Sequence, residues 1–179
     1  MSNFLSKIVR LRPVAMGLAA GLLITGVLAV IGGSYAHQGA HDQLMPQKIF
    51  FPESEADGLP ANLSQYAGEQ VDTGAEAKAY ADDFIGLHLK EIGGGKTYAE
   101  SSGAALAAPD DEQLAQQTQT LFRGETLRGL LLNAWGWGTV GTVALIAGWV
   151  LIALGAILFL LPALDALLNG RRGEARPQG

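Results

Sequence analysis

Two long apolar runs, separated by a polar middle, dominate the pattern of this chain. No charged residue occurs from Val14 to Gly33 or from Ala134 to Leu164, whereas nearly all the acidic residues lie between these runs. A helix rises about 1.5 Å per residue, so roughly 18 or more apolar residues cross the about 30 Å hydrocarbon core of a bilayer. The pattern therefore predicts transmembrane helices over residues 14–34 and 134–162.

The polar middle shows helical signals in two places. Thr73, followed three residues later by Glu76, is a capping-box pattern, and it predicts a helix near 73–92 that ends at the three glycines 93–95. The apolar face of this helix is expected to comprise Ala77, Ala81, Phe84, Ile85, His88 and Ile92. Acidic residues after Pro109 predict a second helix near 110–133, which continues into the second span with Gly124 as a candidate break.

Three prolines within residues 36–72 change the expectation for that stretch to extended chain and turns. Its apolar triplet, residues 49–51, is expected to dock on the helices. At the far end of the second span, Pro162 is expected to interrupt the helix, with a short turn from Asp165 to Gly170.

The distribution of charge predicts how the spans are oriented. Basic residues precede the first span and follow the second: Lys7, Arg10, Arg12, Arg171, Arg172 and Arg176. From Tyr35 to Trp137 the chain instead holds six basic and fifteen acidic residues, a net charge of −9. The excess of basic residues predicts cytoplasmic tails at 1–13 and 163–179, and the acidic segment 35–133 is then extracytoplasmic. A signal peptide cleaved near Ser34 is the alternative for the first span, but the apolar run is longer than is usual for one.

The predicted fold class is thus an all-α membrane protein: a two-helix transmembrane hairpin with a small, mostly helical extracytoplasmic segment in the plasma membrane. The acidic balance argues against nucleic acid as a partner. The absence of cysteine excludes disulfides and thiol chemistry.

Small residues recur along both spans. Gly17, Gly21, Thr25 and Ala29 are spaced four apart, and Gly141, Gly148 and Gly155 are spaced seven apart. Small side chains let two helix backbones approach closely, so both stripes predict helix packing, either within the hairpin or with another membrane protein or a second copy. The aromatic residues at the outer boundary are expected to anchor in the lipid interface: Tyr35, Trp135 and Trp137.

Two short motifs are candidates for chemistry. Gly95-Lys96-Thr97 ends like a phosphate-binding P-loop, but residue 90, where the first glycine of that motif belongs, is lysine, and a helix precedes it; nucleotide binding is not expected. His37 and His41 have the i, i+4 spacing of metal ligands, with Asp42 or His88 to complete a site. An extracytoplasmic metal-binding or sensing protein is therefore the alternative function, although His88 fits packing on its helix better.

The chain resembles a group of uncharacterised two-span membrane proteins from actinobacteria over nearly its whole length. The resemblance is carried by the segments HDQLMPQKIFFP, YAGEQVDTGAEAKAYADDFIGLHL, GGGKTYAE and LFRGETLRGLLLNAWGWGTVG. It implies the hairpin topology, the plasma membrane and a bacterial host. Some members carry an automatic label of aromatic ring-opening dioxygenase, which implies an iron site; the resemblance supplies no catalytic residue for one. The function expected is non-enzymatic and without a cofactor: protein association at the cell envelope, as an accessory subunit or scaffold.

Overall fold

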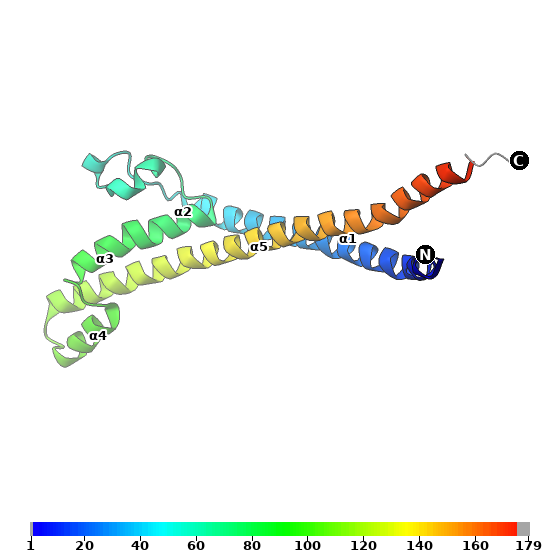
Figure 1. Cartoon of the computed structure of the whole chain (residues 1–179). Helices are drawn as coiled ribbons and strands as arrows, with labels where there is room; N and C mark the ends of the chain where they lie inside the picture. Colours follow the sequence, from blue (N-terminus) through cyan, green and yellow to red (C-terminus); the bar gives the residue numbers. More distant parts are fainter. Residues whose placement is uncertain (1, 175–179) are drawn as a thin grey trace, which may run out of the picture. The chain divides into compact units, whose positions relative to one another are not determined.

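The computed structural model describes the backbone of residues 2–174 and the side chains of residues 13–161. Within this part of the chain every regular element is helical, as the sequence predicts (Figure 1). The long helices are α1 (Ser2–Leu44) and α5 (Glu112–Glu174). Between them lie η1 (Met45–Gln47), η2 (Glu55–Asp57), η3 (Ala61–Tyr66), α2 (Gly74–Ala79), the π-helical turn η4 (Tyr80–Ile85), α3 (Gly86–Ile92) and α4 (Tyr98–Ala107).

The chain divides into two compact units. Unit 1 comprises residues 1–34 and 142–179, and unit 2 comprises residues 35–141. Two helical stretches are long and apolar enough to cross a membrane: Pro13–Gln47, which comprises most of α1 with η1, and Glu112–Leu161 of α5. Only 11% of the most apolar window in each helix is buried.

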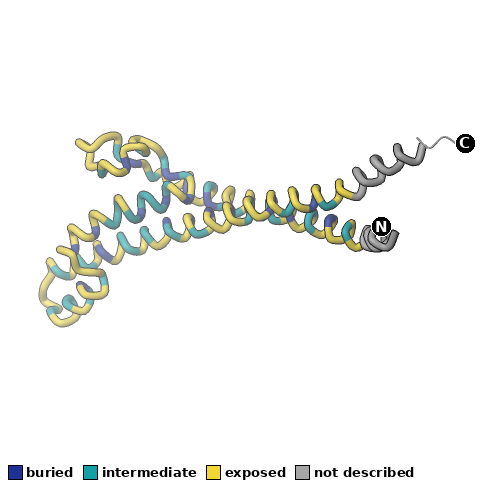
Figure 2. The backbone as a smooth tube through the Cα atoms, viewed as in Figure 1, coloured by how far each residue is buried: buried dark blue, intermediate teal, exposed yellow. Residues whose placement is uncertain are grey.

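Unit 1 is built from apolar helices whose large side chains are mostly exposed (Figure 2). The buried positions are occupied by small residues instead: Ala19, Gly26 and Gly33 on α1, and Gly148 and Gly155 on α5. A water-soluble helix pair shows the opposite arrangement, with the large apolar side chains turned inward. Most large apolar side chains of these two helices, which are long and apolar enough to cross a membrane, are therefore exposed.

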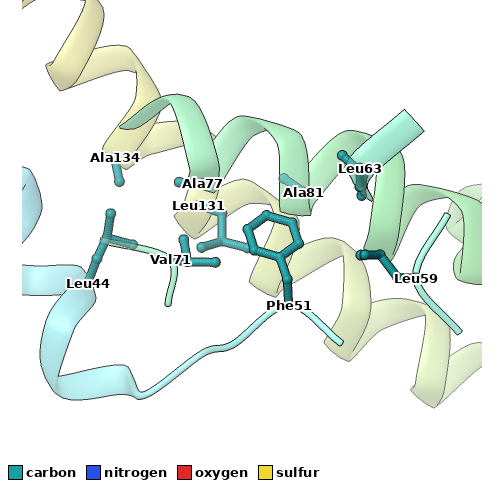
Figure 3. Packing of buried hydrophobic residues seen from close by; sticks show 9 residues of the cluster. All are labelled: Leu44, Phe51, Leu59, Leu63, Val71, Ala77, Ala81, Leu131 and Ala134. Atoms are coloured by element: carbon teal, nitrogen blue, oxygen red, sulfur yellow. The ribbon is translucent and has the colours of Figure 1, made fainter. Parts of the chain in front are cut away.

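Unit 2 has a small hydrophobic core under the loop that precedes α2. Its members come from the last turn of α1, the loop, α2, η4 and α5, and they point toward one another (Figure 3): Leu44, Phe51, Leu59, Leu63, Val71, Ala77, Ala81, Leu131 and Ala134. The ring of Phe51 stacks on Tyr66 with centroids 5.0 Å apart and meets the edge of Tyr80 at 5.1 Å. These contacts fix the loop over the helices.

The docked triplet has the alternation of a short strand. Phe51 is buried and Ile49 is half-buried, whereas Phe50 between them faces outward. The backbone bonds Phe51 N–H to Glu69 O (2.9 Å) and Val71 N–H to Ile49 O (2.8 Å) hold two segments of the loop together. The expected docking of this triplet is confirmed for two of its three residues.

The ends of the middle helices follow the capping residues in the sequence. Thr73 and Glu76 form the predicted capping box of α2, and the helical run ends where Gly94 and Gly95 adopt φ angles of 59° and 81°. The side chain of Asp111 accepts a hydrogen bond from Leu114 N–H (2.9 Å) at the start of α5. The predicted starts near residues 73 and 110 are confirmed, and α5 runs through Gly124 without a break.

Two expectations about helix extent are wrong, and one helix was missed. Residues 36–44 are not extended, because α1 continues to Leu44 and ends just before Pro46. The helix α4 was not expected; its start is a second capping box between Thr97 and Glu100. Pro162 does not interrupt α5, and the stretch expected to be a turn, Asp165 to Gly170, is helical. Apolar helices tolerate a proline where neighbouring groups satisfy the freed carbonyl.

Ser101 of α4 gives a test of the packing between α4 and α5. Its side chain is fully buried and its hydroxyl has no hydrogen-bond partner. A buried unpaired hydroxyl destabilises a fold by about 1–3 kcal/mol. We expect Ser101→Ala to raise the midpoint of thermal unfolding by about 2–4 °C, measured by circular dichroism on the full chain. Ser102→Ala is the control, because Ser102 is a half-buried neighbour in the same helix and the change alters helix propensity equally. An equal gain in both variants would contradict the explanation by an unpaired hydroxyl.

Candidate helix-packing site

The helices of unit 1 touch backbone to backbone at two glycines. A Cβ atom added to Gly26 would lie 2.8 Å from the carbonyl oxygen of Gly148 and 2.9 Å from the amide nitrogen of Ile152. Conversely, a Cβ atom on Gly148 would lie 2.8 Å from the carbonyl oxygen of Gly26 and 2.9 Å from the nitrogen of Val30. Real Cβ atoms do not approach backbone this closely, so each position admits only glycine.

A third glycine extends this contact by two turns. A Cβ atom on Gly155 would lie 3.0 Å from the carbonyl oxygen of Ala19 and 2.9 Å from Cγ of Leu23. Gly148 faces Gly26, and Gly155, later in α5, faces Ala19, which is earlier in α1. The two helices are therefore antiparallel. We call Gly26, Gly148 and Gly155 the glycine seam.

The repeat of seven residues sets the geometry of the seam. Buried small residues recur at this interval on α1 (19, 26 and 33) and on α5 (141, 148 and 155). A repeat of seven is shorter than two full turns of a straight helix, which gives a left-handed crossing. On α5, Gly148 and Gly155 contact α1, and Gly141, which belongs to unit 2, is also buried.

The stripe expected on α1 lies on a different face from the seam. Gly17 and Gly21 are exposed, and an added Cβ atom at either would have nothing within 4 Å. At 3.6 residues per turn, Gly17 and Gly21 each lie roughly 160° around the helix from Ala19, in opposite directions. We call Gly17, Gly21 and the exposed Thr25 the outer stripe. The α1 half of the seam was missed; its signal was the repeat of seven shared with α5.

The three aromatic residues expected at the lipid interface are exposed in unit 2. The exposed fractions are 80% for Tyr35, 38% for Trp135 and 54% for Trp137. The ammonium of Lys78 lies 4.8 Å from the ring centroid of Trp135, a cation–π contact. This contact joins α2 to α5.

Arg128 of α5 joins α5 to the π-helical turn through hydrogen bonds. Its Nε donates to the carbonyl of Ala81 (3.0 Å), and its two Nη atoms donate to Asp82 (3.1 Å) and Glu125 (2.9 Å). The same Ala81 carbonyl accepts the i+5 bond from Gly86 N–H that defines the π turn. Hydrogen bonds from Lys78, and then from Arg128, lower the pKa of Asp82, so its carboxylate remains charged in this network.

The π turn shifts the buried face of the helix by one residue. Leu89 is buried, and its side chain occupies the space that a Cβ atom on Gly124 would need. His88 and Ile92 were expected on this face but are exposed, because a π turn inserts one extra residue. The ring Nδ1 of His88 lies 2.7 Å from the carbonyl oxygen of Phe84.

The candidate metal ligands do not form a site. His37 and His41 lie one turn apart on α1; the Nδ1 of His41 is 3.8 Å from a carboxylate oxygen of Asp72, and Asp42 accepts a hydrogen bond from Gln38 (2.8 Å). Within the described part of the chain, no group of three or more His, Asp or Glu side chains is placed to hold a metal ion. His88 does not join His37 and His41 in such a group.

The Gly-Lys-Thr motif is the connection between α3 and α4. The backbone N–H and the hydroxyl of Thr97 both donate to the Glu100 carboxylate, at 2.8 Å and 2.9 Å. These bonds lower the pKa of Glu100, with the backbone bond contributing most. The protein's own carboxylate thus occupies the position at the start of α4 that a phosphate would need.

Comparison with known proteins adds no relative: no family model, no curated protein and no solved structure matches the chain. The resemblance to the actinobacterial group stays a prediction. The function proposed below therefore rests on the geometry of the helix-packing site.

The glycine seam predicts a large and specific effect of side-chain volume. Gly148→Ile forces a branched side chain against the α1 backbone, so we expect the free energy of unfolding to fall by about 1–3 kcal/mol or more. Gly32→Ile is the control, because a Cβ atom there meets nothing within 4 Å. Thermal unfolding of both variants in detergent measures the difference, and equal stability would contradict the close contact.

The Arg128 network predicts which residue of α3 is protected. The chain has no cysteine, so a single introduced cysteine reports its own exposure to a maleimide. We expect Leu89→Cys to react slowly and His88→Cys to react fast. Adding Arg128→Met removes the donor to Ala81 and should reduce the difference in labelling rate at least about tenfold, whereas adding Arg123→Met, an exposed arginine of the same helix, should not. Equal rates at 88 and 89 with Arg128 intact would contradict the shifted face.

Proposed function

We propose that this chain is a non-enzymatic integral membrane protein that acts through protein–protein association at the cell envelope, as an accessory subunit or scaffold. In this proposal the apolar helices cross the plasma membrane as a hairpin at 14–34 and 134–162. The termini are cytoplasmic, and the acidic segment 35–133 lies outside the cytoplasm. The basic tails and the −9 charge of the middle support this orientation.

The surface of unit 1 supports a lipid environment. The side chains that α1 and α5 expose are large and aliphatic: Val14, Leu18, Ile24, Leu28, Val143, Ile146, Val150, Leu154 and Ile157. In water, burial of such side chains between the helices would be favourable. In lipid this burial gives no hydrophobic free energy, because the lipid tails are equally apolar. The helix pair is then stabilised by close backbone packing at small residues, and the glycine seam provides this packing.

The outer stripe is the observation that carries the association proposal. The glycine seam packs Gly26, Gly148 and Gly155 within the chain's own helix pair, while Gly17 and Gly21 have open space around them. Their four-residue spacing is the pattern with which membrane helices cross closely in a right-handed pair. The stripe thus fits a helix from outside the described pair, from a second copy or another membrane protein.

The alternative function, a metal-binding or sensing protein using His37 and His41, has less support. The pair needs a third ligand, and the described side chains do not supply one beside it. We therefore propose association rather than metal binding.

A double variant tests the association. Gly17→Leu with Gly21→Leu should reduce self-association or partner recovery at least about tenfold, because each Leu blocks the close approach that small residues allow. Association is measured by cross-linking in mild detergent and by co-purification from the native host with mass spectrometry. The control is Val27→Phe, an exposed position at least about 80° around the helix from both stripe glycines. Unchanged complexes in the double variant, or equal loss in the control, would reject the outer stripe.

A further inference from the structure

The middle of each apolar run contains a single side chain with an O–H or N–H group. In residues 14–33 this side chain is Thr25, and in residues 143–161 it is Trp149. Both residues are exposed, and the exposed fraction of Trp149 is 62%. Among the described residues neither side chain has a hydrogen-bond partner. Tryptophan is typical of the membrane–water interface, so a tryptophan in the middle of an apolar helix needs an explanation.

The glycine seam places Thr25 and Trp149 at the same level of the helix pair. Gly26 faces Gly148, and the two helices are antiparallel. Thr25 precedes Gly26 and Trp149 follows Gly148, so both residues are displaced from the contact by about 1.5 Å in the same direction. In a hairpin with spans at 14–34 and 134–162 this level is the middle of both spans; this step rests on the proposed function.

Thr25 and Trp149 lie on opposite sides of the helix pair. Each residue is about 100° around its own helix from the neighbouring seam glycine. Because the helices are antiparallel, one step backward along α1 and one step forward along α5 rotate in the same sense. The two seam glycines point toward each other, so equal rotations direct Thr25 and Trp149 to opposite sides. A second chain in the same orientation can therefore present its Thr25 to the Trp149 of the first chain, at the same level.

The two side chains are complementary as donor and acceptor. The hydrocarbon core of a membrane contains no water to accept from the indole N–H of Trp149. The hydroxyl of Thr25 has one donor and two acceptor positions, so it can accept from an indole even while it donates to a carbonyl of its own helix. Gly21 and Ala29 lie one turn to either side of Thr25 and are small, which leaves room for a large ring to reach the hydroxyl.

We propose that the partner in the association is a second copy of this chain, and that the indole N–H of Trp149 in one copy donates to the hydroxyl of Thr25 in the next. A second copy in the same membrane and orientation supplies the acceptor at the level of the donor by its own geometry. The contact joins two different surfaces of the chain, so it is heterologous. A heterologous contact repeats from copy to copy and forms a ring where the rotation between copies closes.

A double-mutant cycle tests the hydrogen bond. Self-association of the full chain is measured in vesicles by energy transfer between labelled copies. Trp149→Phe keeps an aromatic ring but removes the N–H, so we expect the association constant to fall about threefold, the effect of an average hydrogen bond between membrane helices. Thr25→Val should have the same effect, and the double variant should lose no more than either single variant. Trp137→Phe, the same change at a tryptophan that is 54% exposed, is the matched control and should leave association unchanged.

Cross-linking tests which surfaces meet. The chain has no cysteine, so an introduced cysteine is the one site for a bismaleimide. Leu18 lies on the side of α1 that carries Thr25, Ala153 lies on the side of α5 that carries Trp149, and both are exposed. We expect Leu18→Cys chains to cross-link to Ala153→Cys chains when the two are mixed, with at least about tenfold less product from either variant alone.

Each outcome decides for or against the proposal. Equal product from one cysteine variant alone, an equal loss in Trp137→Phe and Trp149→Phe, or an additive loss in the double variant would overturn it. Where Trp149→Phe does not insert into vesicles, the cross-linking of chains with the native Trp149 decides. A chain that co-purifies with a different membrane protein but does not self-associate rejects the second copy alone. A chain that associates with no protein rejects both this contact and the proposed function.

Discussion

The backbone contact between Gly26 and Gly148 sets the separation of α1 and α5 in unit 1. Because a Cβ atom on either residue would lie under 3 Å from the facing backbone, the distance is fixed by main-chain atoms and not by side-chain size. The large aliphatic side chains are then left on the outside of the pair. The same contact thus explains why only small residues are buried in unit 1 and why so little of its apolar surface is covered.

Unit 2 is held by different interactions. Its core is small, and it depends on residues such as Phe51 and Val71 from a loop with little regular structure. Arg128 adds polar bonds that tie α5 to both the backbone and the side chains of the π turn. A guanidinium is suited to this role because its donors are rigidly arranged and it does not lose its charge at physiological pH. The half-buried position of this residue keeps the cost of desolvating the charge moderate.

The sequence predicted the elements whose signals are local. Thr73 with Glu76 located the start of α2, and the absence of charge located both apolar helices. Prediction from the sequence failed where a contact with another helix decides which side chain is buried. His88 was expected inside because the pattern assumed a regular α-helix, whereas the bond from Arg128 to Ala81 supports a π turn and buries Leu89 instead. The seam on α1 was missed for a related reason: Gly17 and Gly21 form the more familiar motif, but only comparison with the repeat on α5 identifies Ala19 and Gly26.

The placement of small residues on two opposite faces of α1 has a physical consequence for assembly. Had Gly17 and Gly21 lain beside Gly26, a partner helix would have competed with α5 for the same face. Instead Gly17 and Gly21 are roughly 160° around the helix from Ala19, so a partner can pack on α1 while the seam stays intact. Association would then leave the antiparallel pair unchanged and need no energy to open it. Variants of the outer stripe and variants of the seam should for this reason act independently, since neither set shares a contact with the other.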